Sequence, residues 1–152
     1  MLTAGVQAPA FALPNLKGEV KRSSDYLEQG PTLFVFYKAS CPTCQLTLPF
    51  LERLKDTAAL HIVLISQDDA KTATKFRQKF DLTLETLLDG RGYPASNAYR
   101  IENVPTLFLV TPAGVIERSW SGFSKADMEA LASYAGQPIF HANENVPLFR
   151  PG

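Results

Sequence analysis

An excess of charge of either sign is the first feature that the sequence lacks. Its 15 Lys and Arg residues balance 15 Asp and Glu residues, so the formal net charge is +0. A balanced chain creates no long-range field that would attract nucleic acid or an anionic membrane. No apolar run approaches the roughly 20 residues that a membrane span needs. We therefore expect no nucleic-acid partner and no membrane span.

The start of the chain also lacks the features of a targeting segment. Residues 1–5 contain neither a basic stretch nor the apolar run of a signal peptide. The sequence as written predicts a cytoplasmic location. If a leader has been removed, the expectation becomes a periplasmic or other extracytoplasmic location.

Cysteine is scarce, with only Cys41 and Cys44 in 152 residues. Two cysteines three positions apart do not form the framework of a small disulfide-stapled secreted domain. A chain of this length buries a full core without staples. The pair is therefore predicted to serve chemistry rather than stability.

Apolar periodicity predicts an alternation of strands and helices. The unbroken apolar runs 32–37 and 60–65 are typical of strands covered on both faces. Further strands are predicted at 11–13, 19–21, 84–88, 106–110 and 115–120. Helices are predicted to begin after Cys41, after Asp68 or Asp69, near Ala95 and after Ser124, where apolar residues recur at spacings of three and four.

This order of elements predicts an α/β protein with a mixed central sheet and helices on both faces. It is the plan of the thioredoxin-like fold with an added N-terminal β-hairpin. We expect residues 1–136 to form the thioredoxin-like domain. Residues 137–152 have no clear period and contain three prolines, so we expect a tail packed on or near the domain.

A Cys-x-x-Cys pair at the junction of a central strand and a helix has a specific chemical use. Unpaired N–H groups and the helix dipole stabilise a thiolate at the cap position. With Cys41 as the cap, Pro42 takes the first helical position, which suits its fixed φ. Cys44 then lies one turn into the helix. Cys41 is predicted to be the nucleophile and Cys44 the resolving thiol, with Pro42 and Thr43 tuning the pair.

Two other interpretations of the cysteines remain open. They could be half of a zinc site completed by His61 and His141, although the histidines lack the usual close spacing. They could also be two small buried apolar residues.

The sequence resembles the thioredoxin-like TlpA/ResA group of thiol-disulfide oxidoreductases. This group is a branch of the redoxin (AhpC/TSA) superfamily, which also contains the peroxiredoxins. The resemblance covers about residues 4 to 136 and rests on five segments taken together. These are 5–13, the strand 34–37 running into Cys41-Pro42-Thr43-Cys44, Pro49, Val104-Pro105-Thr106, and Gly114-Val115-Ile116.

The resemblance implies a cis bond between Val104 and Pro105 that faces the cysteine pair. Val104 would then present its backbone groups to an extended substrate strand. We therefore predict Val104, Pro105, Pro42 and Thr43 as substrate-binding residues. The alternative is an ordinary trans proline at the start of an edge strand.

Three positions depart from the family pattern. Ser40 stands where thioredoxin has a tryptophan, and Val35 where it has a buried aspartate. Thr47 stands where ResA-like reductases carry a glutamate that assists proton transfer. The sequence therefore predicts no internal base for the proton that Cys44 must lose during exchange, which leaves bulk water or a substrate group to accept it.

A peroxiredoxin-like thiol peroxidase with an antioxidant role is the main alternative function. Peroxiredoxins place a threonine or serine three residues before the reactive cysteine and a proline seven before. Those positions are Lys38 and Phe34 here, so the usual peroxide pocket is not expected. A third hypothesis is a non-catalytic binding module with Trp120, Phe123 and Phe140 as contacts, although such aromatic residues are more often core.

These observations together predict an enzyme, a thiol-disulfide oxidoreductase acting on protein or small disulfides. We expect no metal and no organic cofactor. The expected partner is a protein that carries a disulfide or a dithiol, and a thioredoxin- or glutathione-type electron donor is one candidate. The direction of transfer depends on the potential of the pair relative to its compartment.

Overall fold

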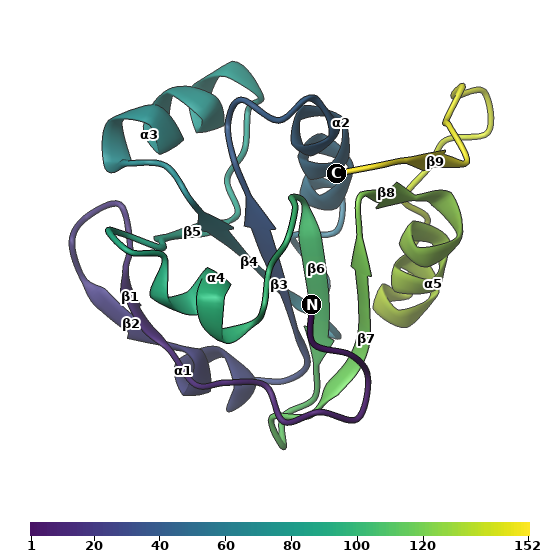
Figure 1. Cartoon of the computed structure of the whole chain (residues 1–152). Helices are drawn as coiled ribbons and strands as arrows, with labels where there is room; N and C mark the ends of the chain where they lie inside the picture. The colour runs from purple at the N-terminus through teal and green to yellow at the C-terminus, as the bar shows by residue number, and fades with distance from the viewer.

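The computed structural model describes the chain from Met1 to Gly152. In chain order its elements are β1 (Ala12–Pro14), β2 (Val20–Arg22), α1 (Ser23–Leu27), β3 (Thr32–Tyr37), α2 (Pro42–Glu52), β4 (His61–Ser66), α3 (Ala70–Lys79), β5 (Glu85–Leu88), α4 (Pro94–Ala98), β6 (Thr106–Val110), β7 (Ile116–Ser121), β8 (Phe123–Ser124), α5 (Lys125–Ala135) and β9 (Phe149–Arg150). Figure 1 shows their arrangement.

The central sheet has five strands in the order β5-β4-β3-β6-β7. β3 pairs in parallel with β4, and β4 with β5, whereas β6 runs antiparallel to both β3 and β7. β1 and β2 form a separate antiparallel hairpin. The predicted mixed sheet and the added N-terminal hairpin are therefore confirmed.

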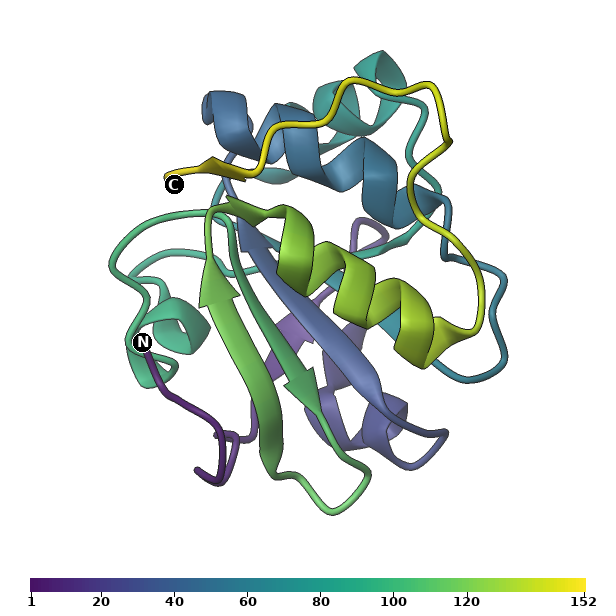
Figure 2. The same cartoon turned by 90° about the vertical axis from the view of Figure 1, so that its right-hand side faces the viewer.

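β3 is the centre of the core because both of its faces are covered. Leu33, Val35 and Tyr37 belong to a cluster with side chains of α2, α3 and α5. Phe34 and Phe36 point the other way, into a cluster with residues of β1 and α4. This alternation follows from the two-residue period of a strand. Figure 2 shows α2 and α5 on one side of the sheet, and the prediction of helices on both faces is confirmed.

Most predicted elements are present within one or two residues. α1, β8 and β9 were not predicted, because none is longer than five residues and none has a measurable period. Trp120 and Phe123 are 5% and 0% exposed, as expected of core residues. None of the helices has the length and apolar character to cross a membrane.

Candidate functional site

The site lies at the edge of the sheet where β3 ends and β6 begins. Because these strands are antiparallel, Phe36 near the end of β3 pairs with Thr106 at the start of β6. The loop that follows β3 carries Cys41, and the loop that precedes β6 carries Val104 and Pro105. Sheet topology therefore brings together two segments that are far apart in the sequence.

Cys41 is the N-cap of α2, as predicted. Its backbone is extended (φ −84°, ψ 116°), and Pro42 is in the first turn of the helix. The backbone N–H of Cys44 donates to Cys41 Sγ at 3.1 Å. This is the contact by which a helix start stabilises negative charge on a capping atom.

The two thiols differ in their access to solvent. Cys41 is half-buried and Cys44 is buried, with 0% exposure, and both are free. Burial raises the pKa of the Cys44 thiol well above its usual range, and the neighbouring Cys41 and the charge of Asp68 raise it further. Cys44 is therefore kept as a neutral thiol, whereas Cys41 is the sulfur that an incoming molecule can reach.

Val104 faces the reactive cysteine. The bond between Val104 and Pro105 is cis, as the family resemblance implied. The Cys41 thiol donates to the carbonyl oxygen of Val104 at 3.3 Å. Pro105 is buried, and its carbonyl oxygen accepts the N–H of Gly122 at 2.8 Å.

The two residues between the cysteines lie at the same place. Pro42 is exposed, and Thr43 is half-buried. The Thr43 hydroxyl donates to the carbonyl oxygen of Pro151 at 2.7 Å. The structure thus gathers the predicted site residues around one sulfur atom, and it adds a segment near the C-terminal end that sequence analysis did not place there.

Asp68 is a carboxylate near the pair that sequence analysis treated only as a possible helix cap. Asp69 is the cap of α3, because its Oδ1 accepts the N–H of Thr72 at 2.8 Å. Asp68 Oδ2 instead accepts the N–H of Ala39 at 2.7 Å. Its position follows from the parallel pairing of β3 and β4, which no local motif records.

The positions where relatives keep carboxylates contain no free acceptor. Val35 is fully buried in the core. The Thr47 hydroxyl donates to the carbonyl oxygen of Thr43 at 2.7 Å, and a hydroxyl is too weak a base to replace a carboxylate. Asp68 is therefore the acidic side chain in this region whose charge acts on Cys44.

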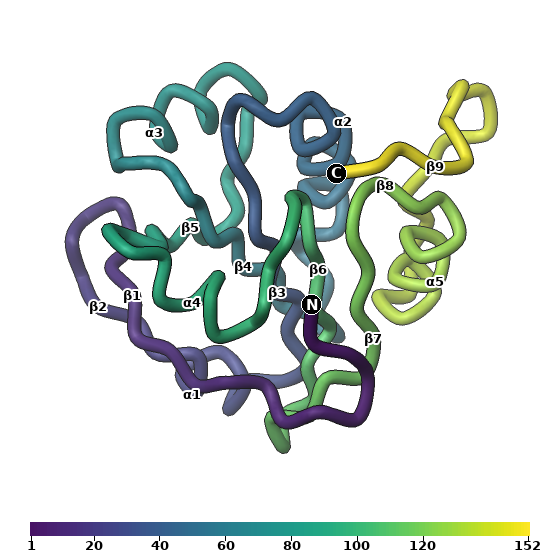
Figure 3. The backbone as a smooth tube through the Cα atoms, in the orientation of Figure 1, coloured from purple at the N-terminus to yellow at the C-terminus, as the bar shows by residue number.

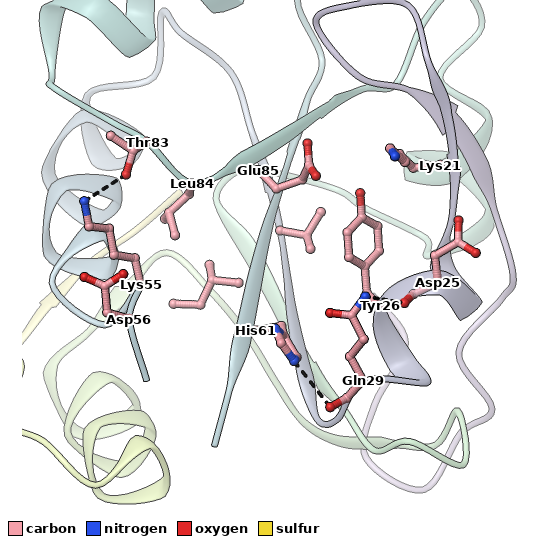
Figure 4. Close-up of a pocket in the computed structure, with 12 residues that line it drawn as sticks. Lys21, Asp25, Tyr26, Gln29, Lys55, Asp56, His61, Thr83, Leu84 and Glu85 are labelled. Carbon is pink, nitrogen blue, oxygen red and sulfur yellow. Dashed lines mark hydrogen bonds between the residues drawn. The ribbon is translucent and has the colours of Figure 1, made fainter. Parts of the chain in front are cut away.

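A surface pocket lies away from the cysteines. It has a volume of ≈ 510 Å³ and is lined mainly by polar side chains from α1 and from the starts of β4 and β5. Figure 4 shows His61 beside the carbonyl of Gln29 and Lys55 donating to Thr83. The cysteines follow the end of β3, which runs parallel to β4, whereas the pocket lies at the starts of β4 and β5, so the pocket is separate from the candidate site.

The histidines do not join the cysteines. His61 lines that separate pocket, and the backbone N–H of His141 donates to Glu144. No group of three or more His, Cys, Asp or Glu side chains is placed to hold a metal ion. The zinc interpretation of the cysteine pair is therefore wrong.

Comparison with known proteins bears on this arrangement. Residues 4–119 match the AhpC/TSA family. The chain belongs to the AhpC/TSA family. A relative in this group is the thiol-disulfide oxidoreductase ResA of Geobacillus kaustophilus, which is 30% identical over 133 residues, covering 84% of this chain and 75% of the relative. A putative peroxiredoxin of Mycobacterium tuberculosis is 35% identical over 91 residues, covering 58% of each chain.

A solved structure with the same fold is a putative thiol:disulfide interchange protein DsbE from Chlorobium tepidum. It has a TM-score of 0.78 and 26% identity, and the match covers 88% of this chain and 96% of that one. The AhpC/TSA assignment and these relatives identify the chain as an oxidoreductase with a thioredoxin-like fold, in agreement with the sequence prediction.

Proposed function

We propose that this AhpC/TSA protein exchanges two electrons with disulfides through Cys41 and Cys44. The observation that carries the proposal is the position of Cys41 Sγ. It caps α2, accepts the N–H of Cys44, and lies against the carbonyl of Val104. One sulfur thus lies at the start of a helix, where reactive cysteines are commonly found, and beside backbone groups that can hold a partner strand.

The exchange takes two steps. The Cys41 thiolate attacks one sulfur of a partner disulfide, forming a mixed disulfide and releasing the other partner sulfur as a thiolate. Cys44 then gives its proton to the released partner thiolate or to water and attacks Cys41 Sγ. The second partner thiol leaves, and a Cys41–Cys44 disulfide remains. Two electrons pass to the partner, and the reverse sequence oxidises a partner dithiol.

The order of the two thiols follows from their burial. An incoming molecule reaches the half-buried Cys41, whereas Cys44 is closed off from solvent. Burial raises the pKa of Cys44, so the resolving thiol is protonated when the partner arrives and must lose its proton before it attacks.

The partner class is a protein that carries a disulfide or a dithiol, with thioredoxin- or glutathione-type donors as candidates for recharging the pair. Support comes from the exposure of Pro42 and from the backbone of Val104, which lies beside Cys41 Sγ at the edge formed by the start of β6. A polypeptide can add to such an edge by main-chain hydrogen bonds. The relative named a thiol-disulfide oxidoreductase is consistent with this class.

Equilibration in glutathione redox buffers, followed by thiol counting, tests the proposal. We expect Cys41 and Cys44 to lose their thiols together in a single two-electron transition. A potential near the thioredoxin value of about −270 mV supports a reductase, and one near the DsbA value of about −120 mV supports an oxidase. A folded chain that forms no intramolecular disulfide at any potential refutes the proposal.

A thiol peroxidase is the second candidate function, favoured by the similarity to a putative peroxiredoxin. Lys38 is exposed and Phe34 is buried in the core, so neither supplies the polar contacts of a peroxide pocket. We expect slow, non-saturating consumption of hydrogen peroxide with dithiothreitol as donor. Rapid saturable turnover would favour the peroxidase. If neither cysteine reacts with alkylating agents in the folded protein, the binding-module hypothesis is preferred.

A further inference from the structure

The segment from Phe149 to Gly152 lies on the candidate site. β9 pairs antiparallel with β8, so that Arg150 faces Phe123. The N–H of Lys125 donates to the carbonyl oxygen of Leu148 at 3.0 Å, which extends this pairing. Figures 1 and 2 show the yellow end of the chain reaching the start of α2, and Figure 3 shows the same path as a tube.

Beyond β9 the segment contacts both sides of the reactive cysteine. The carbonyl oxygen of Pro151 accepts the hydroxyl of Thr43 at 2.7 Å. Gly152 lies so close to Val104 that an added Cβ would be 2.5 Å from the Val104 carbonyl oxygen. The segment therefore bridges the two residues that flank the path to Cys41.

Gly122, which lies between β7 and β8, makes this close approach possible. Its φ is +79°, and a Cβ there would lie 2.4 Å from the carbonyl oxygen of Arg150. Glycine suits both the positive φ and the close backbone contact. Thr43, Val104 and Gly122 thus surround the backbone of residues 150–152, and we call the surface formed by these three residues the groove.

The segment is held much less firmly than the chain that leads to it. Leu148 and Phe149 are 80% and 58% exposed, and neither belongs to the core clusters. Upstream, Ile139 is 2% exposed, and Glu144 forms a two-pronged ion pair with Arg53 at 2.7 Å. The strand is therefore tethered next to the groove by a stable anchor, yet it can leave without disturbing the core.

We propose that residues 149–152 occupy, in the resting protein, the groove that takes an extended strand of a disulfide-bearing polypeptide, and that the partner must displace them. This inference rests on the proposed function. It also specifies the partner as an extended polypeptide whose residue next to the Val104 carbonyl is small. A small disulfide needs less of the groove and competes less with the segment.

The test compares Gly152→Val with the matched control Gly90→Val. A side chain at 152 collides with the backbone of Val104, whereas Gly90 has no atom within 4 Å of an added Cβ and no positive φ. The probes are insulin and oxidised glutathione, with dithiothreitol as the reductant. If the segment occupies the groove at least about two-thirds of the time, its full release raises kcat/KM for insulin at least about threefold. Oxidised glutathione changes less, and Gly90→Val leaves both values unchanged.

A second variant, with the chain ended after Pro147, removes the exposed strand and keeps the anchor. It is expected to match or exceed Gly152→Val, with an unchanged melting temperature as the check on folding. Equal insulin activity in the shortened and full chains overturns the inference while leaving the proposed function intact. The proposed function itself is refuted if neither chain reduces either probe and neither forms a Cys41–Cys44 disulfide in glutathione redox buffers.

Discussion

The thiol of Cys41 lies 3.3 Å from the carbonyl oxygen of Val104, although 63 positions separate the two residues in the sequence. The contact depends on the antiparallel pairing of β3 and β6, which brings the end of one strand to the start of the other. Buried side chains of both strands hold this pairing in place. The chemistry proposed for Cys41 thus depends on how the sheet is assembled. Substitutions at the site test the chemistry, and substitutions in the core test the packing that supports it.

Alkylation should distinguish the two thiols. Burial raises the pKa of Cys44, so it stays protonated and unreactive at neutral pH. Iodoacetamide should therefore modify the folded chain once, at Cys41, and mass spectrometry after proteolysis would locate the adduct. In Cys41→Ser the folded protein should remain unmodified at neutral pH until denaturant is added. Comparable labelling of both cysteines in the folded chain would contradict the assigned asymmetry.

Asp68 offers a way to change Cys44 without touching it. Its negative charge contributes to the raised pKa of the Cys44 thiol. Asp68→Asn removes the charge and retains an oxygen that can accept the N–H of Ala39, so the pKa of Cys44 should fall. In a Cys41→Ser background, the pH dependence of Cys44 alkylation should move to lower pH. Asp69→Asn, at the exposed cap of α3, serves as the control and should leave that dependence unchanged.

The packing of α2 should dominate stability around the site. Leu51 is 0% exposed in the core, so Leu51→Ala should lower the free energy of unfolding by about 2–5 kcal/mol. Leu148 is 80% exposed, and Leu148→Ala should change the free energy of unfolding by less than about 0.5 kcal/mol. Urea unfolding followed by circular dichroism measures both. Similar values for the two variants would show that α2 does not pack as described.

The anchor of the C-terminal segment should respond to acid. The hydrogen bonds from the Arg53 side chain and from the His141 backbone lower the pKa of Glu144 from 4.5 to about 2. Because the folded value lies below the ordinary one, the ion pair stabilises the fold fully above pH 4.5. This contribution is lost as pH falls towards about 2.

The amide resonance of His141 reports this titration, since its N–H donates to Glu144 Oε1. Its chemical shift should follow a transition centred near pH 2, and Glu144→Gln should abolish the transition. Glu28→Gln, on a different part of the surface, should leave it in place. A midpoint near the ordinary carboxyl value would mean that the Arg53 ion pair does not form in solution.

Much of the fold could be predicted because it depends on local patterns. The apolar run at β3 and the helical spacing after Cys41 each identify an element within a short window. Cys41 and Pro42 indicated the start of α2 for the same reason. The position of Val104 opposite Cys41 came from the family resemblance, since no local signal specifies it.

The rest of the site depends on tertiary contacts. Asp68 looks like a helix cap in the sequence, and only the parallel pairing of β3 and β4 turns it toward Ala39. Phe149 and Arg150 form too short a strand to have a period, so their pairing with β8 had no sequence signature. Gly122 is one glycine among nine until its approach to the Arg150 carbonyl is known.

In the proposed exchange Cys41 attacks and Cys44 resolves. Incubation of Cys44→Ser and Cys41→Ser with oxidised glutathione, followed by intact-mass measurement, distinguishes the two roles. We expect a stable glutathione adduct on Cys41 in the Cys44→Ser chain and almost none in the folded Cys41→Ser chain. A stable adduct on Cys44 in Cys41→Ser, with none on Cys41 in Cys44→Ser, would contradict this assignment.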